Sequence, residues 1–167
     1  MPRLDYSNGS CPALLLEPQR TNLVDNSERL STGYLLLTGL TFEQNTDETL
    51  SPEGKYNATK LTATSGTWYS WKNIAATNNT STISMYVKAV DSNSNNTFRF
   101  KLGNTYSDTF TATDEWQRFS YTALNDNPYS GLTFPNPTKL SSLYIYGLQL
   151  EQDATYPTSY IPTYGVS

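Results

Sequence analysis

The chain has 167 residues, of which 16% are charged, and its formal net charge is -4. This length fits one domain with a sizeable core. A sparsely charged, acidic chain lacks the basic surface that duplex nucleic acid requires, so we expect no nucleic-acid partner. No apolar run approaches the roughly 18 residues of a membrane-spanning helix, so we expect no membrane insertion.

The sequence gives no sign of an enzyme. It contains no histidine, which removes the commonest general base and zinc ligand. No motif places the two carboxyl groups, roughly 5 to 9.5 Å apart, that a glycosidase needs. The single cysteine, Cys11, cannot form an internal disulfide, and we interpret it as a spectator in a loop. We therefore expect no catalytic residues and no required cofactor.

The first residues predict a hairpin followed by an ordered arm. Arg3–Tyr6 is a short extended segment, and Asn8-Gly9 is a turn dipeptide because both residues tolerate positive φ. Ala13–Leu16 is a second apolar strand. Pro18 ends this strand, since proline cannot donate to a sheet ladder.

The middle of the chain contains strands separated by turn signals. Thr82–Val90 is the clearest, with an apolar residue at every second position. Thr97–Leu102 alternates in the same way, which predicts Phe98 and Phe100 inward and Arg99 outward. No helical period occurs, so the pattern favours an all-β sandwich or barrel. The other expected strands are 34–37, 41–45, 60–64, 67–74, 109–113, 116–121 and 139–152, with a long loop at 125–137 and an extended tail at 155–163.

The two ends of the chain carry motifs that resemble one known family. Pro2–Asp5, Leu14–Leu23 and Ser27–Glu28 resemble the "PRxDY…LLLEPxRTNL…SE" signature of a domain common in bacteriophage tail, tail-fibre and other virion proteins. Tyr146–Gln152 and Thr158–Thr163 resemble the "GxQLExGxxxTSYIPT" ending of the same domain. The two markers bracket nearly the whole chain.

The resemblance implies an architecture. Family members carry a jelly-roll β-sandwich of two antiparallel sheets, like a carbohydrate-binding module, with an N-terminal hairpin and arm. We therefore expect residues 1–27 to form a hairpin and arm packed on the domain, and residues 28–167 to form the jelly roll. Because the termini of a jelly roll commonly lie on neighbouring strands, we expect Leu23 near Leu148.

Aromatic side chains are the best candidates for binding. The flat face of a sugar stacks on an exposed ring, and its hydroxyls need fixed polar partners. Trp68, Tyr69, Trp71, Arg99 and Tyr106 form the expected carbohydrate-binding set. Strand alternation puts Trp68 and Trp71 on opposite faces, so one tryptophan is expected to be exposed. The alternative interpretation is that these rings belong to the core or to cross-strand pairs.

A structural calcium ion is a second expectation that the resemblance implies. Jelly-roll binding modules often hold Ca²⁺ between the first and last strands, and calcium takes oxygen ligands. Asp25, Glu28 and Gln149 are the oxygen donors at matching ends of this chain. The acidic pair that many such modules have in the last strand is Tyr146-Gly147 here.

The functional hypothesis is a non-enzymatic bacteriophage virion domain on a tail fibre, head fibre or baseplate-associated protein. Its expected partners are a host-surface glycan and other virion proteins, and fibres of this kind imply a homo-oligomer, most simply a trimer. Its expected location is the surface of the phage particle. Two alternatives stay open: a structural capsid or tail decoration or trimerisation module without sugar binding, and an accessory carbohydrate-binding module of a polysaccharide-degrading enzyme.

Overall fold

The N-terminal hairpin forms as expected in the computed structural model. Strand β1 (Arg3–Asp5) pairs antiparallel with β2 (Ala13–Leu15). The Asn8-Gly9 turn and Cys11 lie outside the described residues, and packing of the hairpin on the domain stays a prediction. The structure describes residues 3–5, 13–15, 17–29, 35–71, 78–91, 96–135 and 141–165, with side chains described in 17–29, 40–63, 78–91, 96–135 and 141–165.

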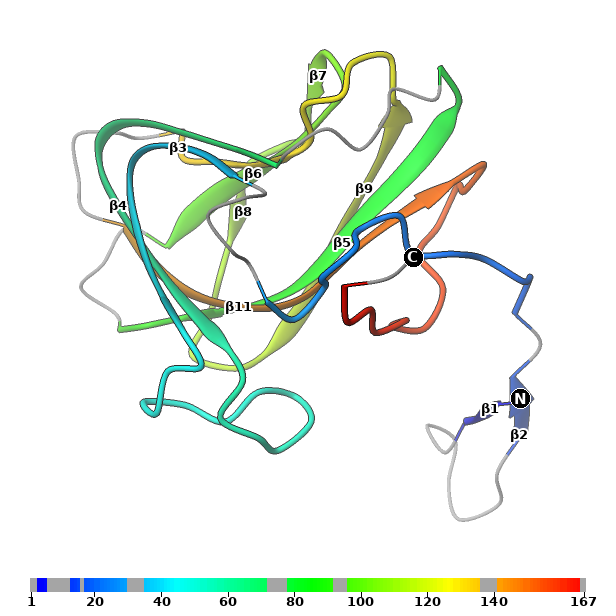
Figure 1. Cartoon of the computed structure of the whole chain (residues 1–167), viewed down its shortest axis with the longest axis horizontal. Coiled ribbons are helices and arrows are strands. Elements are labelled where there is room, and N and C mark those ends of the chain that lie inside the picture. Colours follow the sequence, from blue (N-terminus) through cyan, green and yellow to red (C-terminus); the bar gives the residue numbers. More distant parts are fainter. Residues whose placement is uncertain are drawn as a thin grey trace.

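The rest of the described chain is a β-sandwich in which all strand pairs are antiparallel (Figure 1). This confirms the all-β jelly-roll prediction. No described segment is a helix of the length and apolar character needed to cross a bilayer. The strands are β3 (Leu35–Gln44), β4 (Thr59–Trp71), β5 (Thr80–Ala89), β6 (Thr97–Leu102), β7 (Thr105–Tyr106), β8 (Phe110–Thr111), β9 (Gln117–Leu124), β10 (Gly131–Thr133) and β11 (Ser141–Gln152).

Strand β4 belongs to both layers of the sandwich. Its first half, Thr59–Ala63, pairs with β11, whereas Trp68 in its second half pairs with Thr133 of β10. One layer therefore runs β4-β11-β5-β9 and the other runs β4-β10-β6-β7. Strand β3 pairs along both halves of β4 and curves with it (Figure 1). A single long strand therefore joins the two layers. The buried residues of both layers form one hydrophobic core between them.

The core follows the alternation that the sequence predicts. In β6, Phe98 and Phe100 are fully buried, whereas Arg99 is partly exposed. Phe98 meets Phe119 of β9 edge-to-face, with ring centroids 5.1 Å apart, which joins the two layers. The buried residues that fill the space between the layers include Leu61, Ile83, Met85, Val87, Leu132, Leu143, Ile145, Leu148 and Leu150.

Strand β11 is buried on both faces, and the N-terminal arm runs beside it. Leu23 N donates to Leu150 O at 2.8 Å, and Leu148 N donates to Ser27 O at 3.1 Å. The arm therefore continues the sheet next to the second half of β11, where β4 no longer pairs. The expectation that the first and last segments are neighbours is confirmed, with Leu23 paired to Leu150, two residues from the expected Leu148.

The C-terminal tail covers the outward side of β11. Gln149 Oε1 accepts a hydrogen bond from Ile161 N at 2.7 Å, and Gln149 Nε2 donates to Ser159 O at 3.4 Å. The buried carboxylate of Glu151 accepts from Thr158 N at 3.0 Å and from the Thr158 hydroxyl. Polar side chains on a doubly buried strand therefore obtain their partners from the tail.

The arm and the tail also bind each other, and we call residues 22–27 with residues 158–165 the terminal junction. Thr163 N donates to Ser27 Oγ at 2.8 Å, and Ser27 Oγ lies 2.6 Å from the Tyr160 hydroxyl. Gly165 N donates to Asp25 O at 2.7 Å. The two termini therefore end in one hydrogen-bonded layer over β11.

The Asn22 side chain joins all three parts of this layer. Its Nδ2 donates to Leu148 O and Ile161 O, both at 3.0 Å, and its Oδ1 accepts from Val24 N and Leu150 N, both at 3.1 Å.

Asn22→Ala leaves several buried backbone groups without partners, and each unpaired group lowers the free energy of unfolding by about 1–3 kcal/mol. We expect a loss of roughly 3 kcal/mol or more in the free energy of unfolding, measured in urea. The exposed Gln152→Ala variant is the control, and equal stability of the two variants contradicts this role.

Gly147 gives a second test, in the irregular part of β11. Its φ is +65°, and an added Cβ lies 3.1 Å from the Tyr160 ring. Gly54 has a φ of +75°, but no atom lies within 4 Å of an added Cβ. Gly54→Ala therefore measures backbone strain alone, about 1–2 kcal/mol. We expect Gly147→Ala to lower the melting temperature more, and a smaller effect than that of Gly54→Ala contradicts the packing of Tyr160 on β11.

Candidate functional site

The outward side of β6 carries two cations, and each has a local partner. Arg99 Nε donates to Thr109 Oγ1 at 2.9 Å. Lys101 Nζ lies 5.7 Å from the centroid of the Tyr129 ring, which is a cation–π contact. Tyr129 remains 42% exposed. This contact holds a partly exposed ring beside the strand.

Tyr106 adds a second exposed ring to the same side. Lys101 and Tyr106 are cross-strand partners in β6 and β7, so their side chains share a face. Tyr106 is 40% exposed, and partial burial raises the pKa of its phenol. We call Arg99, Lys101, Tyr106 and Tyr129 the β6 face. The structure thus brings the predicted Arg99 and Tyr106 to one surface and adds Tyr129 and Lys101.

The three other predicted aromatic residues are placed by backbone only. Trp68, Tyr69 and Trp71 lie in the second half of β4 and pair with β3. Trp68 also pairs with Thr133, which in turn pairs with Arg99 across β10. The backbone of Trp68 is therefore two strands from Arg99 in the same register. The side chains of these three residues lie outside the described ones, so which tryptophan is exposed stays a prediction.

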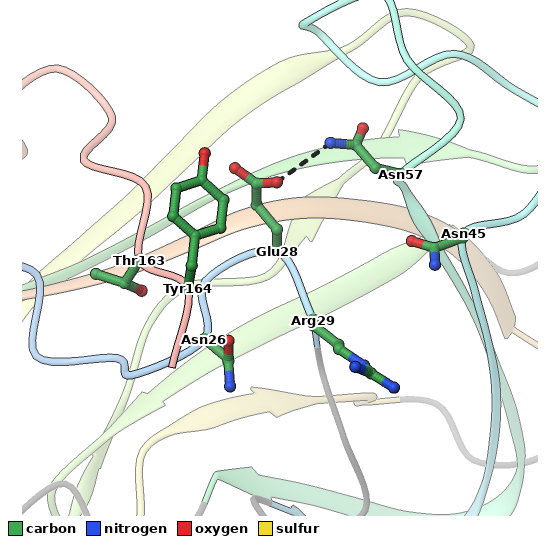
Figure 2. Close-up of a pocket in the computed structure, with 7 residues that line it drawn as sticks. All are labelled: Asn26, Glu28, Arg29, Asn45, Asn57, Thr163 and Tyr164. Atoms are coloured by element: carbon green, nitrogen blue, oxygen red, sulfur yellow. Dashed lines mark hydrogen bonds between the residues drawn. The ribbon is translucent and has the colours of Figure 1, made fainter. Parts of the chain in front are cut away.

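A polar cavity of about 280 Å³ lies beside the terminal junction (Figure 2). It is built by the arm, the loop between β3 and β4, and the tail. We call it the junction pocket. Figure 2 shows the Tyr164 ring beside the Glu28 carboxylate, which faces Asn57. Its lining residues are Asn26, Glu28, Arg29, Asn45, Asn57, Thr163 and Tyr164.

The terminal junction holds the tail side of this pocket. Asn26 and Tyr164 form an antiparallel β-bridge. The backbone is therefore fixed at Tyr164, although its side chain is 71% exposed. Burial and the negative charge of Glu28 raise the pKa of the Tyr164 phenol. The phenol thus stays protonated at neutral pH and can donate a hydrogen bond at the mouth of the pocket.

The opposite wall is the loop between β3 and β4, which three side chains fix to the sandwich. Lys60 Nζ donates to both oxygens of Glu48, at 2.6 and 2.7 Å, and Lys88 Nζ donates to Thr49 Oγ1 at 3.2 Å. Trp116 Nε1 donates to Leu50 O at 2.8 Å. These contacts fix the loop that presents Asn45 and Asn57.

The residues predicted for calcium do not gather in one described pocket. Glu28 lines the junction pocket, whereas Gln149 lies under the tail, where its side-chain oxygen already accepts from Ile161 N. The backbone oxygen of Asp25 accepts from Gly165 N. Within the described ranges, no three Asp, Glu or Cys side chains form a metal-binding group. Calcium binding stays a prediction, and this geometry gives it no ligand set.

Comparison with solved structures identifies the fold. A variant of a family 29 carbohydrate-binding module aligns with a TM-score of 0.57 and 15% identity, over 84% of this chain and 100% of its own. The CBM22-1 xylan-binding domain from Paenibacillus barcinonensis aligns with a TM-score of 0.55 and 15% identity, over 84% and 100%. A family 29 variant in complex with mannohexaose has a TM-score of 0.56 and 14% identity, over 81% and 92%. The chain therefore has the β-sandwich fold of these modules.

Sequence comparison adds no family to this result. No family model and no curated protein matches the chain.

The sequence analysis did not predict Tyr129 or most of the junction pocket. Tyr129 lies in a segment expected to be a loop, and the pocket residues come from three separate stretches of polar sequence. The one available signal was the resemblance at both termini, which predicted that the first and last segments meet.

The loop contacts predict a small pH effect. Hydrogen bonds from Lys60 and then Tyr144 hold the pKa of Glu48 below its usual 4.5. Because the folded-state pKa is lowered, these contacts stabilise the fold above that pH and are lost as the pH falls through the folded pKa. The Glu48 side chain is 39% exposed, so we expect Glu48→Gln to cost less than about 1 kcal/mol at pH 7.

The same cost should shrink as the pH falls below 4.5. Urea unfolding of the parent and Glu48→Gln at several pH values measures the difference. The exposed Glu115→Gln variant controls for the loss of one surface charge. A Glu48→Gln cost that is the same at pH 7 and in acid contradicts the assignment.

Proposed function

We propose that this chain is a non-enzymatic carbohydrate-binding domain of a bacteriophage virion that binds host-surface glycan through the β6 face. One observation carries the binding site: the partly exposed rings of Tyr106 and Tyr129 share the outward side of β6 with Arg99 and Lys101, while the inward side is core. The fold of carbohydrate-binding modules supports the same function.

The chemistry of the β6 face fits a neutral glycan. The C–H face of a sugar stacks on a tyrosine ring, and a guanidinium or ammonium donates to its hydroxyls. The rings are held from the side by Lys101 and by the β7 turn, so little ordering is needed on binding. A small stacked contact gives a dissociation constant on the order of millimolar to micromolar at each site. Trp68, Tyr69 and Trp71 lie in β4, two strands from β6, and Trp68 is in register with Arg99. We therefore expect Trp68 to extend this proposed surface.

The virion setting rests on the motifs at residues 2–28 and 146–163, which resemble a phage tail and fibre domain. In that setting the domain lies at the surface of the particle, on a tail fibre, head fibre or baseplate-associated protein. Its partners are other virion proteins and copies of itself, in a trimer. Several weak sites held together raise the overall avidity without any new contact at each site.

Two alternatives make different predictions. An accessory module of a polysaccharide-degrading enzyme would bind a soluble polysaccharide rather than bacterial cells, and the solved xylan-binding neighbour gives this option its support. A structural decoration or trimerisation module would bind no sugar. Testing bacterial surface glycans beside plant polysaccharides therefore separates the three.

An array that carries bacterial surface glycans and plant polysaccharides tests the proposal, and calorimetry then measures the affinities of the glycans that bind. We expect a bacterial surface glycan to bind. Tyr106→Ala and Tyr129→Ala should each weaken binding by up to about tenfold, because each removes a stacking surface worth up to about 1.4 kcal/mol. Tyr156→Ala is the matched control. Tyr156 is also partly exposed, at 51%, and also lies beside a cation, but that cation is Arg20 and not a residue of the β6 face.

Three results would contradict parts of the proposal. Binding of plant polysaccharide alone favours the enzyme-accessory alternative, and a folded domain that binds neither class favours the structural module. Glycan binding that survives both tyrosine substitutions rejects the β6 face. Light scattering of the isolated domain measures the trimer separately.

A further inference from the structure

The junction pocket holds a buried acceptor atom, Asn57 Oδ1, that lacks a donor in the described part of the chain. Glu28 Oε2 accepts from Asn57 Nδ2 at 3.3 Å. The phenol of Tyr164 interacts with the same carboxylate, which adds to the effect of burial in raising the pKa of that phenol. Asn57 Oδ1 is buried, and no hydrogen bond of regular geometry reaches it from the described part of the chain. A buried acceptor without a donor costs about 1–3 kcal/mol. The pocket is therefore chemically incomplete as it stands.

We propose that the junction pocket is a second binding site, which takes one residue of a neutral sugar or a similar polyol. One hydroxyl group of the ligand donates to Asn57 Oδ1, and a second donates to the Glu28 carboxylate, which it shares with the Tyr164 phenol. The exposed Tyr164 ring lies beside Glu28 and offers a stacking surface for the C–H face of the same ring (Figure 2). This site does not use any residue of the β6 face.

The charges of the pocket favour a neutral ligand over an ion. Among the described residues that line the pocket, Glu28 is the one carboxylate and Arg29 is the one cationic residue. A bare cation would be repelled by Arg29, and an anion would be repelled by Glu28. A polyol meets neither repulsion, and the amides of Asn26, Asn45 and Asn57 can each donate to or accept from a hydroxyl.

The size of the pocket limits the ligand. Its volume of about 280 Å³ lies just below the range of roughly 300–1,000 Å³ that holds drug-sized ligands. This space suits one sugar ring rather than a chain. The pocket therefore takes one residue of a glycan, whereas the β6 face is open along its strand.

Amide chemical-shift mapping of the full chain tests the proposal without any variant. The probes are the methyl glycosides of glucose, galactose, mannose and N-acetylglucosamine, each titrated into the tens of millimolar range, with EDTA present. We expect at least one probe to shift the amides at residues 26–29, 57 and 163–165 in a saturable way. Residues 99–106 should not follow the same curve, which separates this site from the β6 face.

Variants then assign the contacts. Glu28→Gln keeps the shape but exchanges one acceptor oxygen for a donor, and Tyr164→Ala removes the stacking ring. We expect each to weaken binding of the responding glycoside about tenfold. Glu115→Gln is the matched control, because Glu115 is an exposed carboxylate that does not line the pocket. Tyr106→Ala should leave this binding unchanged even if the β6 face proves inactive.

Three outcomes overturn the inference. In the first, no glycoside shifts the pocket amides, which means that water alone fills the pocket. In the second, calcium chloride shifts them and the glycosides do not, which makes it a cation site. In the third, the glycosides shift the pocket amides but Glu28→Gln and Tyr164→Ala bind as tightly as the parent, which means that the ligand does not use these groups.

Discussion

The structure depends on the burial of β11 on both faces. One face lies on the hydrophobic core, as expected for a central strand, but the other face carries Gln149 and Glu151, which are fully buried. Polar groups in such a place must be hydrogen-bonded, because an unpaired buried acceptor or donor costs about 1–3 kcal/mol. The tail supplies their partners, and Asn22 supplies those of the neighbouring backbone. The terminal junction is therefore a structural part of the sandwich.

The same constraint positions the junction pocket. Once the tail is bound to β11 and the arm, the β-bridge between Asn26 and Tyr164 puts their side chains on one wall. The loop between β3 and β4 makes the other wall, and the bond from Trp116 to Leu50 O ties that loop to the start of β9. The β6 face has a different origin. Arg99 and Lys101 lie on β6, whose inward neighbours, such as Phe98, fix them directly, whereas Tyr106 lies in the two-residue β7 and Tyr129 lies in the segment before β10.

This difference explains what the sequence could and could not predict. Alternation along β5 and β6 gave the correct strands and the correct inward residues, because each has a polar and an apolar side. Strand β10 was expected to be loop, since Gly131–Thr133 is too short for any period and lies between prolines. Residues 60–64 and 67–74 were expected as two strands, but β4 is continuous from Thr59 to Trp71 and joins the layers. The junction pocket could not be predicted, because its side chains meet only through tertiary pairing.

The two proposed sites consequently differ in their coupling to stability. A ligand that binds only the folded junction pocket stabilises the pairing of arm and tail, because binding energy adds to the free energy of the state that binds. By the same linkage, weakening of the terminal junction lowers the fraction of molecules that can bind there, and the apparent affinity falls by that fraction. The β6 face contains no residue of the terminal junction, so weakening of that junction does not act on it directly. The affinity of the proposed junction pocket therefore depends on the local stability of the termini of the chain, and that of the β6 face does not.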